Sequence, residues 1–379
     1  MCYKDDVRKT YRYRLYPSPA QQRAMVCTLR ECRQLYNSLL SERRDAYEQT
    51  GESVSLYSQQ SRFSQRKANN PALKEVHSQV LQNVAVRIDL AFKAFFRRVR
   101  EGATPGFPRF KGASRYDSFT YPQSGFRVDG NRVFLSKIGH VKAVIHRPVE
   151  GEIKTATIRR TSTGKWFVCL SCEVEPEPLE KSTEAVGVDV GLKDIIATSD
   201  GESIPAPKFL RKEEKELART QRRLSEAPKG SRERAKRRKV VAKVHERIKN
   251  KRTDFAHQQS RRLVNRYGFI AVEDLSVNRM VRNHCLAKSI ADAAWTDLIA
   301  KLVYKAGSAD RRVVQVSPAY TTQDCSACGY RQLMPLSKRV YDCPECGLSL
   351  DRDVNAARNI LALGLQSYRD TVPEEAPTL

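Results

Sequence analysis

Residues 325–361 read CSACGYRQLMPLSKRVYDCPECGLSLDRDVNAARNIL and contain two Cys-x-x-Cys pairs, Cys325/Cys328 and Cys343/Cys346. Fourteen residues separate the pairs, and a glycine follows each of them. A Cys-x-x-Cys turn directs two thiolates at one point, and four thiolates complete the tetrahedral shell of Zn²⁺. Glycine permits the tight backbone of such a turn. Because four sulfur ligands leave no open position for water, the spacing predicts a structural zinc ribbon. Two disulfides or four unrelated thiols are the alternative.

Two aspartates open the segment that follows the ribbon. Asp351 is suited to cap a helix, and Asp353 then lies in the first turn, at the positive end of the helix dipole. Both could be capping residues and nothing more. The helix itself is predicted by apolar residues at helical spacing, namely Val354, Ala357, Ile360 and Leu361.

The composition indicates a folded protein with a polyanionic partner. The chain has 379 residues, enough for two or three domains, and a formal net charge of +25. With hydrophobic residues at an ordinary 40%, this excess charge favours nucleic acid as the partner. We see no signal peptide and no apolar run of membrane-spanning length, and expect a soluble intracellular protein. The remaining cysteines lack the spacing of a secreted disulfide framework: Cys2, Cys27, Cys32, Cys169, Cys172 and Cys285.

The N-terminal region predicts one strand and two long helices. Residues 10–16 alternate apolar side chains with arginine, which is typical of a strand with one buried face. Ser18 to Gln21 match a capping box with proline at the first helical position. A second helix is predicted over residues 72–100. Its polar face carries Gln82 and Asn83, side chains that are either simply solvated or able to contact base edges.

Short strands follow from residue 106. Asp129-Gly130 is a typical hairpin turn, and residues 166–174 alternate strictly. Evenly spaced short strands predict a small antiparallel β-barrel, which the strand at 10–16 would complete across the helical insert. The predicted fold class is therefore α+β with several domains.

Two acids stand at the ends of apolar strands. Asp189 lies in GVDVG, on the opposite face from the valines, and Glu273 ends the run FIAVE. A buried carboxylate is costly unless it is paired or binds a cation. With Asp353 these acids make a set of three, and converging carboxylates are stable mainly as ligands of hard divalent cations. Two such cations can activate water and stabilise the leaving oxygen of a phosphodiester. The order Asp, Glu, Asp, with the ribbon before the last acid, indicates an RNase H-like nuclease domain of the RuvC type.

The most basic region lies between the first two acids. Residues 208–252 hold 19 Lys and Arg against 6 Asp and Glu, a net charge of +13. Weak helical periodicity, broken near residues 228–230, predicts a helical hairpin with a phosphate-facing surface. Since the charge is almost all of one sign, a merely solvated helix is a poor explanation. Arg237, Arg238 and Lys239 are candidate phosphate contacts.

Segments along nearly the whole chain resemble TnpB, the transposon-encoded RNA-guided nuclease family related to type V CRISPR effectors. The resemblance rests on GVDVGLKD, AVEDLSVNRM, SIADAAWTDLIAKLVYKA, VSPAYTTQDCSACG, CPECG and DRDVNAARNIL, and further on YRYRLYPSPAQQ, LQN and GFPRFKG.

This resemblance implies a guide RNA, double-stranded target DNA cut beside a short motif, and catalysis by Mg²⁺, two ions being expected, at Asp189, Glu273 and Asp353. It implies that Tyr57, Ser61, Gln82 and Asn83 read the motif. It also implies a monomer in the complex and a cytoplasmic, nucleoid-associated protein of a prokaryote.

The domain organisation that we expect has five parts. They are a β-barrel domain (1–18 and 104–181), a helical recognition domain (19–103), a RuvC-like nuclease domain (182–319 and 348–367), the zinc ribbon as a target nucleic-acid-binding part (320–347) and a disordered tail (368–379).

Three other functions are considered. A conventional transposase shares the nuclease core, but its acids usually run Asp, Asp, Glu. A nuclease-inactive RNA-guided DNA-binding regulator would lack one of the three acids. A structural zinc-ribbon RNA-binding protein would need no carboxylate cluster.

Overall fold

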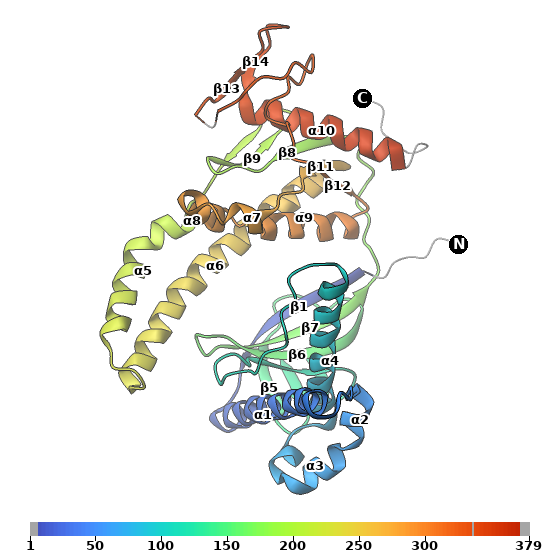
Figure 1. Cartoon of the computed structure of the whole chain (residues 1–379), viewed down its shortest axis with the longest axis vertical. Coiled ribbons are helices and arrows are strands. Elements are labelled where there is room, and N and C mark those ends of the chain that lie inside the picture. Colours follow the sequence, from blue (N-terminus) through green and yellow to red (C-terminus); the bar gives the residue numbers. More distant parts are fainter. Residues whose placement is uncertain (1–6, 336, 372–379) are drawn as a thin grey trace. The chain divides into compact units, whose positions relative to one another are not determined.

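The structure is a computed structural model that describes residues 7–335 and 337–371. The described residues up to Glu175 form one compact unit, unit 1, and those from Pro176 onward form a second, unit 2; each is described by itself (Figure 1). Cys2, the first residues of the predicted barrel and residues 372–379 of the predicted tail lie outside the described residues.

Unit 1 is built on a seven-stranded antiparallel sheet with the order β2-β6-β7-β1-β5-β4-β3. Strand β1 pairs with both β7 and β5, which confirms that the first strand joins those that follow the helices. Its alternation buries Tyr11, Tyr13 and Leu15 in the core. The strands are β1 (Val7–Tyr16), β2 (Ser118–Tyr121), β3 (Phe126–Asp129), β4 (Arg132–Leu135), β5 (Gly139–Val144), β6 (Glu152–Arg160) and β7 (Trp166–Val174).

The sheet is rolled rather than fully closed. Its end strands β2 and β3 are not neighbours in the hydrogen-bonded order of the described strands. Side chains close the seam instead: the Tyr121 hydroxyl donates to the carbonyl of Ser136 at 2.9 Å, and its ring centroid lies 6.5 Å from that of Phe126. Pro122 directly follows β2 and has no N–H for a ladder. The fold is therefore close to the predicted barrel, with a side-chain seam.

The helical insert packs on this sheet to form one core. Ser18 caps α1 in a capping box with Gln21, as predicted. The predicted helix at 72–100 begins later, at Ser78, because Pro71–Glu75 forms a 3-10 turn and Val76 is extended. The helices are α1 (Pro19–Thr50), α2 (Leu56–Ser61), α3 (Phe63–Asn69), η1 (Pro71–Glu75) and α4 (Ser78–Arg100).

Unit 2 is built on a mixed five-stranded sheet with the order β10-β9-β8-β11-β12. Strands β8, β9 and β10 are antiparallel, while β11 runs parallel to both β8 and β12. Their bounds are β8 (Ala185–Asp189), β9 (Asp194–Thr198), β10 (Ser203–Pro205), β11 (Phe269–Glu273) and β12 (Arg312–Val316).

Helices cover both faces of this sheet (Figure 1). One face packs on α6 (Arg232–Arg266) and α9 (Trp295–Ser308), and the other packs on α10 (Arg352–Thr371). Two glycines permit a very close approach of α10: a β-carbon at Gly187 would lie 1.9 Å from the carbonyl oxygen of Ala357, and one at Gly364 would lie 2.5 Å from the Ala271 β-carbon. Helix α10 is thereby held against β8 and β11.

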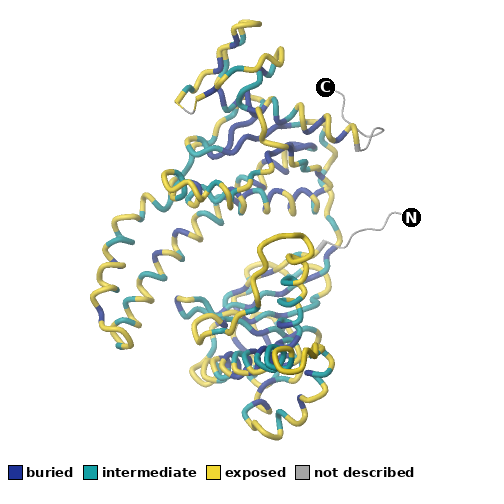
Figure 2. The backbone as a smooth tube through the Cα atoms, in the orientation of Figure 1, coloured by how far each residue is buried: buried dark blue, intermediate teal, exposed yellow. Residues whose placement is uncertain are grey.

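The remaining elements extend from this core. Helix α5 (Phe209–Glu226) and the first half of α6 lie side by side as the predicted hairpin, mostly exposed along its length (Figure 2). Short helices α7 (Val277–Met280) and α8 (His284–Ala293) precede α9, and the ribbon contributes β13 (Val340–Asp342) and β14 (Ser349–Asp351). Helix α10 continues to Thr371, so the predicted start of the disordered tail at residue 368 is wrong.

Candidate functional site

The three predicted acids come from three neighbouring elements. Asp189 and Glu273 are the last residues of the parallel strands β8 and β11, and only 9% and 7% of their surfaces are exposed. The valines beside them pack toward α6 and α9. By strand alternation both acids therefore belong to the α10 face of the sheet. Asp353 lies in the first turn of α10 and its side chain is 15% exposed.

Charge coupling joins the three carboxyl groups. Burial first, and then the negative charges of Glu273 and Asp353, raise the pKa of Asp189 to about 8. Burial also raises the pKa of Glu273, against a hydrogen bond of 2.6 Å that the Thr321 hydroxyl donates to it. Together these shifts describe a buried site with an excess of negative charge.

Two arginines partly balance this charge. Burial and then Asp351 raise the pKa of Asp353, whereas Arg339 and Arg352 lower it. Arg339 approaches the Asp353 carboxylate at 3.5 Å. Arg352 also lowers the pKa of Asp189, but not enough to offset burial. A divalent cation would supply the missing positive charge.

The ribbon cysteines form a tighter group. Their ligand atoms all lie within 4.8 Å of one another, and no comparable group that includes the three acids occurs in the described part of the chain. The Sγ atoms of Cys325 and Cys346, and those of Cys328 and Cys343, are 3.6 Å apart, too far for disulfides. Four thiols at these separations fit a tetrahedral Zn²⁺.

Each half of the cluster is shaped by its own turn. Gly329 donates its N–H to the Cys325 carbonyl at 2.9 Å, and Gly347 donates to the Cys343 carbonyl at 3.1 Å. Both glycines have positive φ, 78° and 74°, which side-chain-bearing residues rarely adopt. The glycine after each Cys-x-x-Cys pair is thus required by the backbone.

Two asparagines of α10 bind the ribbon to the helix that carries Asp353. Asn355 donates to the Asp324 carbonyl at 2.8 Å and accepts from the Ser326 N–H at 2.9 Å. Asn359, one turn later, donates to the carbonyls of Thr321 and Asp324 at 2.8 and 2.7 Å. Sequence reasoning missed this asparagine clamp, although two asparagines four residues apart, and therefore on one face of the helix, were a usable signal.

The predicted motif-reading residues lie on two helices of unit 1 that contact each other, α2 and α4. Tyr57 is 82% exposed, and Ser61 and Gln82 are also exposed. Asn83 is less available, because its side-chain oxygen accepts a hydrogen bond of 3.1 Å from Arg87. The four residues thus lie on two contacting helices, and the side chains of Tyr57, Ser61 and Gln82 are accessible to a ligand.

The three basic residues predicted on the hairpin differ from one another. Arg237 bonds to Glu233 at 2.9 Å and to the carbonyl of Arg223 on the facing helix, so it also joins α5 to α6. Arg238 and Lys239 are exposed, and neither has an acidic partner among the described residues. These two residues are the better candidates for phosphate contacts.

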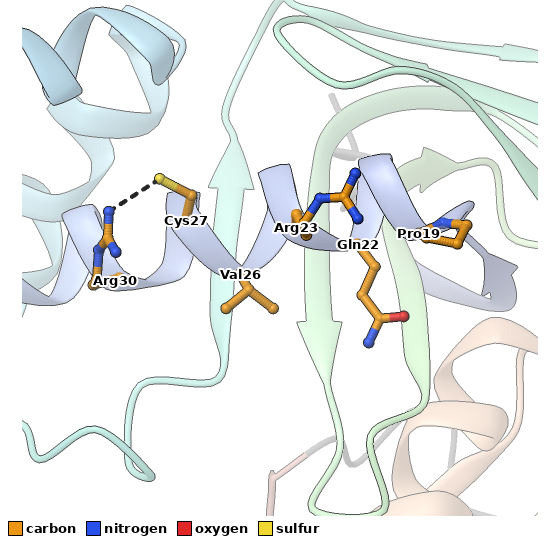
Figure 3. A pocket seen from close by; sticks show the side chains of 6 residues that line it. All are labelled: Pro19, Gln22, Arg23, Val26, Cys27 and Arg30. Carbon is orange, nitrogen blue, oxygen red and sulfur yellow. Dashed lines mark hydrogen bonds between the residues drawn. The ribbon is translucent and has the colours of Figure 1, made fainter.

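An open hollow of about 400 Å³ lies along α1, and none of its lining residues is a predicted site residue. Figure 3 shows its lining side chains on a single helix, with Arg30 bonded to the Cys27 sulfur at 3.4 Å. The lining residues are Pro19, Gln22, Arg23, Val26, Cys27 and Arg30. Its two arginines, Arg23 and Arg30, make this surface basic.

Three family models match the chain. Residues 169–284 match OrfB_IS605, described as "Probable transposase", and residues 295–360 match "Cas12f1-like, TNB domain". Residues 1–52 match "Helix-turn-helix domain". The described part of that last range forms a strand and one long helix, β1 and α1.

Similar proteins cover nearly the whole chain. The "Putative RNA-guided DNA endonuclease" of Streptomyces pristinaespiralis is 35% identical over 95% of this chain and 90% of its own length. The chain belongs to the TnpB family. A second member, the "Putative RNA-guided DNA endonuclease InsQ" of Escherichia coli K12, is 31% identical over 94% of this chain and 92% of its own length. The recognition made from sequence motifs is therefore confirmed.

The TnpB chain also shares its fold with a solved structure. The Cas12f1 chain of a complex with single guide RNA and target DNA aligns with a TM-score of 0.60 over 94% of this chain and 99% of its own length. The sequence identity is 14%, so the likeness concerns the fold. Among the described residues, every helix is too short or too polar to span a lipid bilayer.

Proposed function

We propose that this chain is the RNA-guided DNA endonuclease of a transposon, cutting target DNA beside a short motif by Mg²⁺-dependent hydrolysis of phosphodiesters. The observation that carries the proposal is the charge-coupled set of Asp189, Glu273 and Asp353 at one end of the unit 2 sheet. Family membership supports it, since relatives alike over nearly their full length bear the name of RNA-guided DNA endonucleases.

The nuclease domain is of the RuvC, RNase H-like type in this proposal, comprising residues 182–319 and 348–367. Support comes from the sheet, in which three antiparallel strands are followed by two parallel ones. Further support comes from the position of the acids at the ends of β8 and β11 and at the start of α10.

Three carboxylates are the donor set that Mg²⁺ prefers, and the raised pKa of Asp189 indicates a site short of positive charge. Bound Mg²⁺, two ions in our proposal, would activate water and stabilise the leaving oxygen. Thr321 fixes the orientation of the Glu273 carboxylate through its 2.6 Å hydrogen bond. Asp351 accepts the Asp353 N–H at 2.8 Å and so fixes the first turn of α10. The chain thereby orients its ligands before any metal binds.

Zinc has a different role. We assign Zn²⁺ to the four ribbon cysteines as a structural ion, because four sulfur ligands leave no position for water or substrate. Through the asparagine clamp, a folded ribbon supports the start of α10 and therefore Asp353.

Nucleic acid is bound by the basic and polar surfaces. In our proposal Arg238 and Lys239 on the α5–α6 hairpin contact the phosphates of the guide RNA, while Tyr57, Ser61 and Gln82 contact the motif in duplex DNA. Guide pairing supplies the rest of the sequence specificity. The protein acts as a monomer in this complex.

Reprogramming tests the proposal. The RNA that co-purifies with the chain would be sequenced and its guide segment replaced. We expect Mg²⁺-dependent cleavage to move to the DNA that matches the new segment. Cleavage that stays at a site fixed by the protein, or that needs no RNA, would contradict the proposal and favour a conventional transposase.

A further inference from the structure

Exposed aromatic rings gather at the end of α4 and in the GFPRFKG loop that follows it. Phe96, Phe107 and Phe110 expose 56%, 47% and 46% of their surfaces. Phe107 stands edge-on to Phe92 and Phe95, with centroids 5.5 and 5.6 Å apart. We call these five residues the aromatic patch. Exposed rings on this scale cost free energy in water and indicate a partner.

The loop is held in place, so the exposure of its rings is not a result of loose structure. The Asn37 side chain of α1 accepts the Lys111 N–H at 2.8 Å and donates to the Lys111 carbonyl at 3.1 Å. The Arg44 guanidinium lies over the Phe110 ring, 5.2 Å from its centroid. Arg43, its neighbour on α1, lies 5.5 Å from the Phe92 centroid. The rings therefore form a fixed surface.

The charge around the patch is positive. Residues 93–111 contain six Lys and Arg and one Glu. Lys93 and Arg97 have acidic partners, but Arg98, Arg100 and Arg109 have none among the described residues. A partner that suits both the rings and the unpaired arginines must combine flat apolar faces with negative charge.

Unpaired nucleotides have this combination. Their bases stack on aromatic side chains, and their phosphates bind arginine. A duplex presents the same phosphates but hides its base faces, so it would leave the rings without a partner. We propose that the aromatic patch stacks the unpaired bases of a single-stranded stretch of nucleic acid whose phosphates contact Arg98, Arg100 and Arg109. The proposal goes beyond the proposed function, which requires an unpaired strand but does not say where one is held.

Binding measurements separate stacking from charge. The full-length protein, freed of co-purifying nucleic acid in high salt, would be titrated with a labelled oligothymidine and with a duplex of equal length, without Mg²⁺. We expect the double variant Phe96→Ala/Phe110→Ala to bind the single strand about tenfold more weakly and the duplex unchanged. Leu90→Ala is the matched control, since Leu90 is 57% exposed on the same helix but lies outside the patch.

A fluorescent reporter tests the contact directly. Both native tryptophans are buried, with Trp166 at 2% and Trp295 at 3% exposure. Phe110→Trp therefore introduces the one exposed indole. We expect the single strand to quench its emission and the duplex to leave it unchanged. Leu90→Trp, on the same unit, should not respond to either.

Several outcomes would overturn the proposal. If Phe96→Ala/Phe110→Ala lost equal affinity for single strand and duplex, the patch would contribute through charge or folding and not through stacking. If the double variant kept its full affinity for the single strand, the aromatic patch would not bind unpaired nucleotides. If the double variant lost only its binding to phosphatidylserine vesicles, the partner of the patch would be a membrane surface. If the substitutions changed a dimer into a monomer in sedimentation, the partner would be a second copy of the chain. Because the assay needs no guide and no metal, Asp189→Ala should bind the single strand normally even if the cleavage proposal fails.

Discussion

Two groups of candidate metal ligands in unit 2 differ in how closely their side chains lie together. The four ribbon thiols lie within 4.8 Å of one another, whereas the three acids are coupled in charge but not gathered as tightly. Each pair of thiols is set by one local turn and its glycine. The acids come from residues 189, 273 and 353, so only the packing of β8, β11 and α10 brings them together, and they repel one another. Local sequence can set each half of a thiol cluster, whereas the acid cluster forms only when β8, β11 and α10 pack together.

We expect the largest effect from the substitution of one ribbon cysteine. Structural zinc sites supply about 10 kcal/mol of apparent binding free energy, which is then folding free energy. Cys343→Ser should therefore release zinc, unfold the ribbon and lower cleavage by loosening the helix start at Asp353. Elemental analysis and proteolysis of the ribbon would measure this. Cys285→Ser, an exposed cysteine outside the ribbon, should retain full zinc and activity. Protein purified without zinc would contradict the assignment.

Removing one carboxylate should affect chemistry and not architecture. We expect Asp189→Ala, Glu273→Ala and Asp353→Ala each to lower the cleavage rate by about a thousandfold or more, because each would remove a ligand of the proposed catalytic ions. Guided DNA binding and zinc content should stay near normal. Asp310→Asn, an exposed acid in the same unit, serves as the control. A single variant that still cuts at the normal rate in Mg²⁺ would exclude that residue from the site.

Without a bound cation, the three acids should lower the free energy of unfolding, whereas the zinc-bound ribbon should raise it. An acid whose pKa rises on folding takes up a proton as the chain folds, so stability falls as the pH rises from the unfolded value of about 4 to the folded value of about 8. Without Mg²⁺, Asp189→Asn should therefore be more stable than the native chain by a few kcal/mol near pH 9, and equal to it near pH 4. Denaturant melts at both pH values would test this. Added Mg²⁺ should stabilise the native chain more than the variant. A less stable Asp189→Asn at pH 9 would refute the raised pKa.

The smallest expected effect concerns the α5–α6 hairpin. Arg238→Gln/Lys239→Gln should weaken guide RNA binding and reduce its salt slope by about 0.7 to 0.9 for each lost phosphate contact, about 1.5 for the pair. Arg237→Gln should instead loosen the hairpin, because Arg237 is bonded across it. Filter binding over a salt series, with hydrogen exchange of the hairpin, would separate the two. An equal change of slope in both variants would place Arg237 on the phosphate path as well.

The sequence predicted those features that local patterns specify. The cysteine turns, the capping box of α1, the hairpin of β3 and β4 and the helix break near residue 230 are all determined by residues close together in the chain. The turn of that hairpin lies one residue later than predicted, at residues 130–131, because Asp129 still pairs with Arg132. The start of α4 was misplaced, because Pro71 favours a 3-10 turn that helical periodicity does not reveal. Strand β2 was not predicted either: it is as short as β3 and β4, but it pairs with the distant strand β6 and has no local hairpin to mark it.

Tertiary contacts explain what else was missed at the site. The residues that contact the acids or the ribbon come from distant positions in the sequence, and no local pattern assigns them these partners. They are Thr321, Arg339 and Asn359. The three acids themselves were predicted because two of them end apolar strands, where a buried carboxylate is costly, and the third follows the ribbon at the start of a helix. Their electrostatic coupling, however, became visible only in the folded chain.

The asparagine clamp also defines a unit of exchange. Asn355 and Asn359 bond to backbone atoms of residues 321–326, so the ribbon and the first turns of α10 behave as one interlocked part. Moving residues 325–347 alone into another scaffold would leave these amide bonds behind. A recombined chain that carries residues 320–361 would keep the two asparagines together with the backbone atoms that they bond. Natural or engineered shuffling of such ribbons should therefore have its breakpoints outside this longer segment.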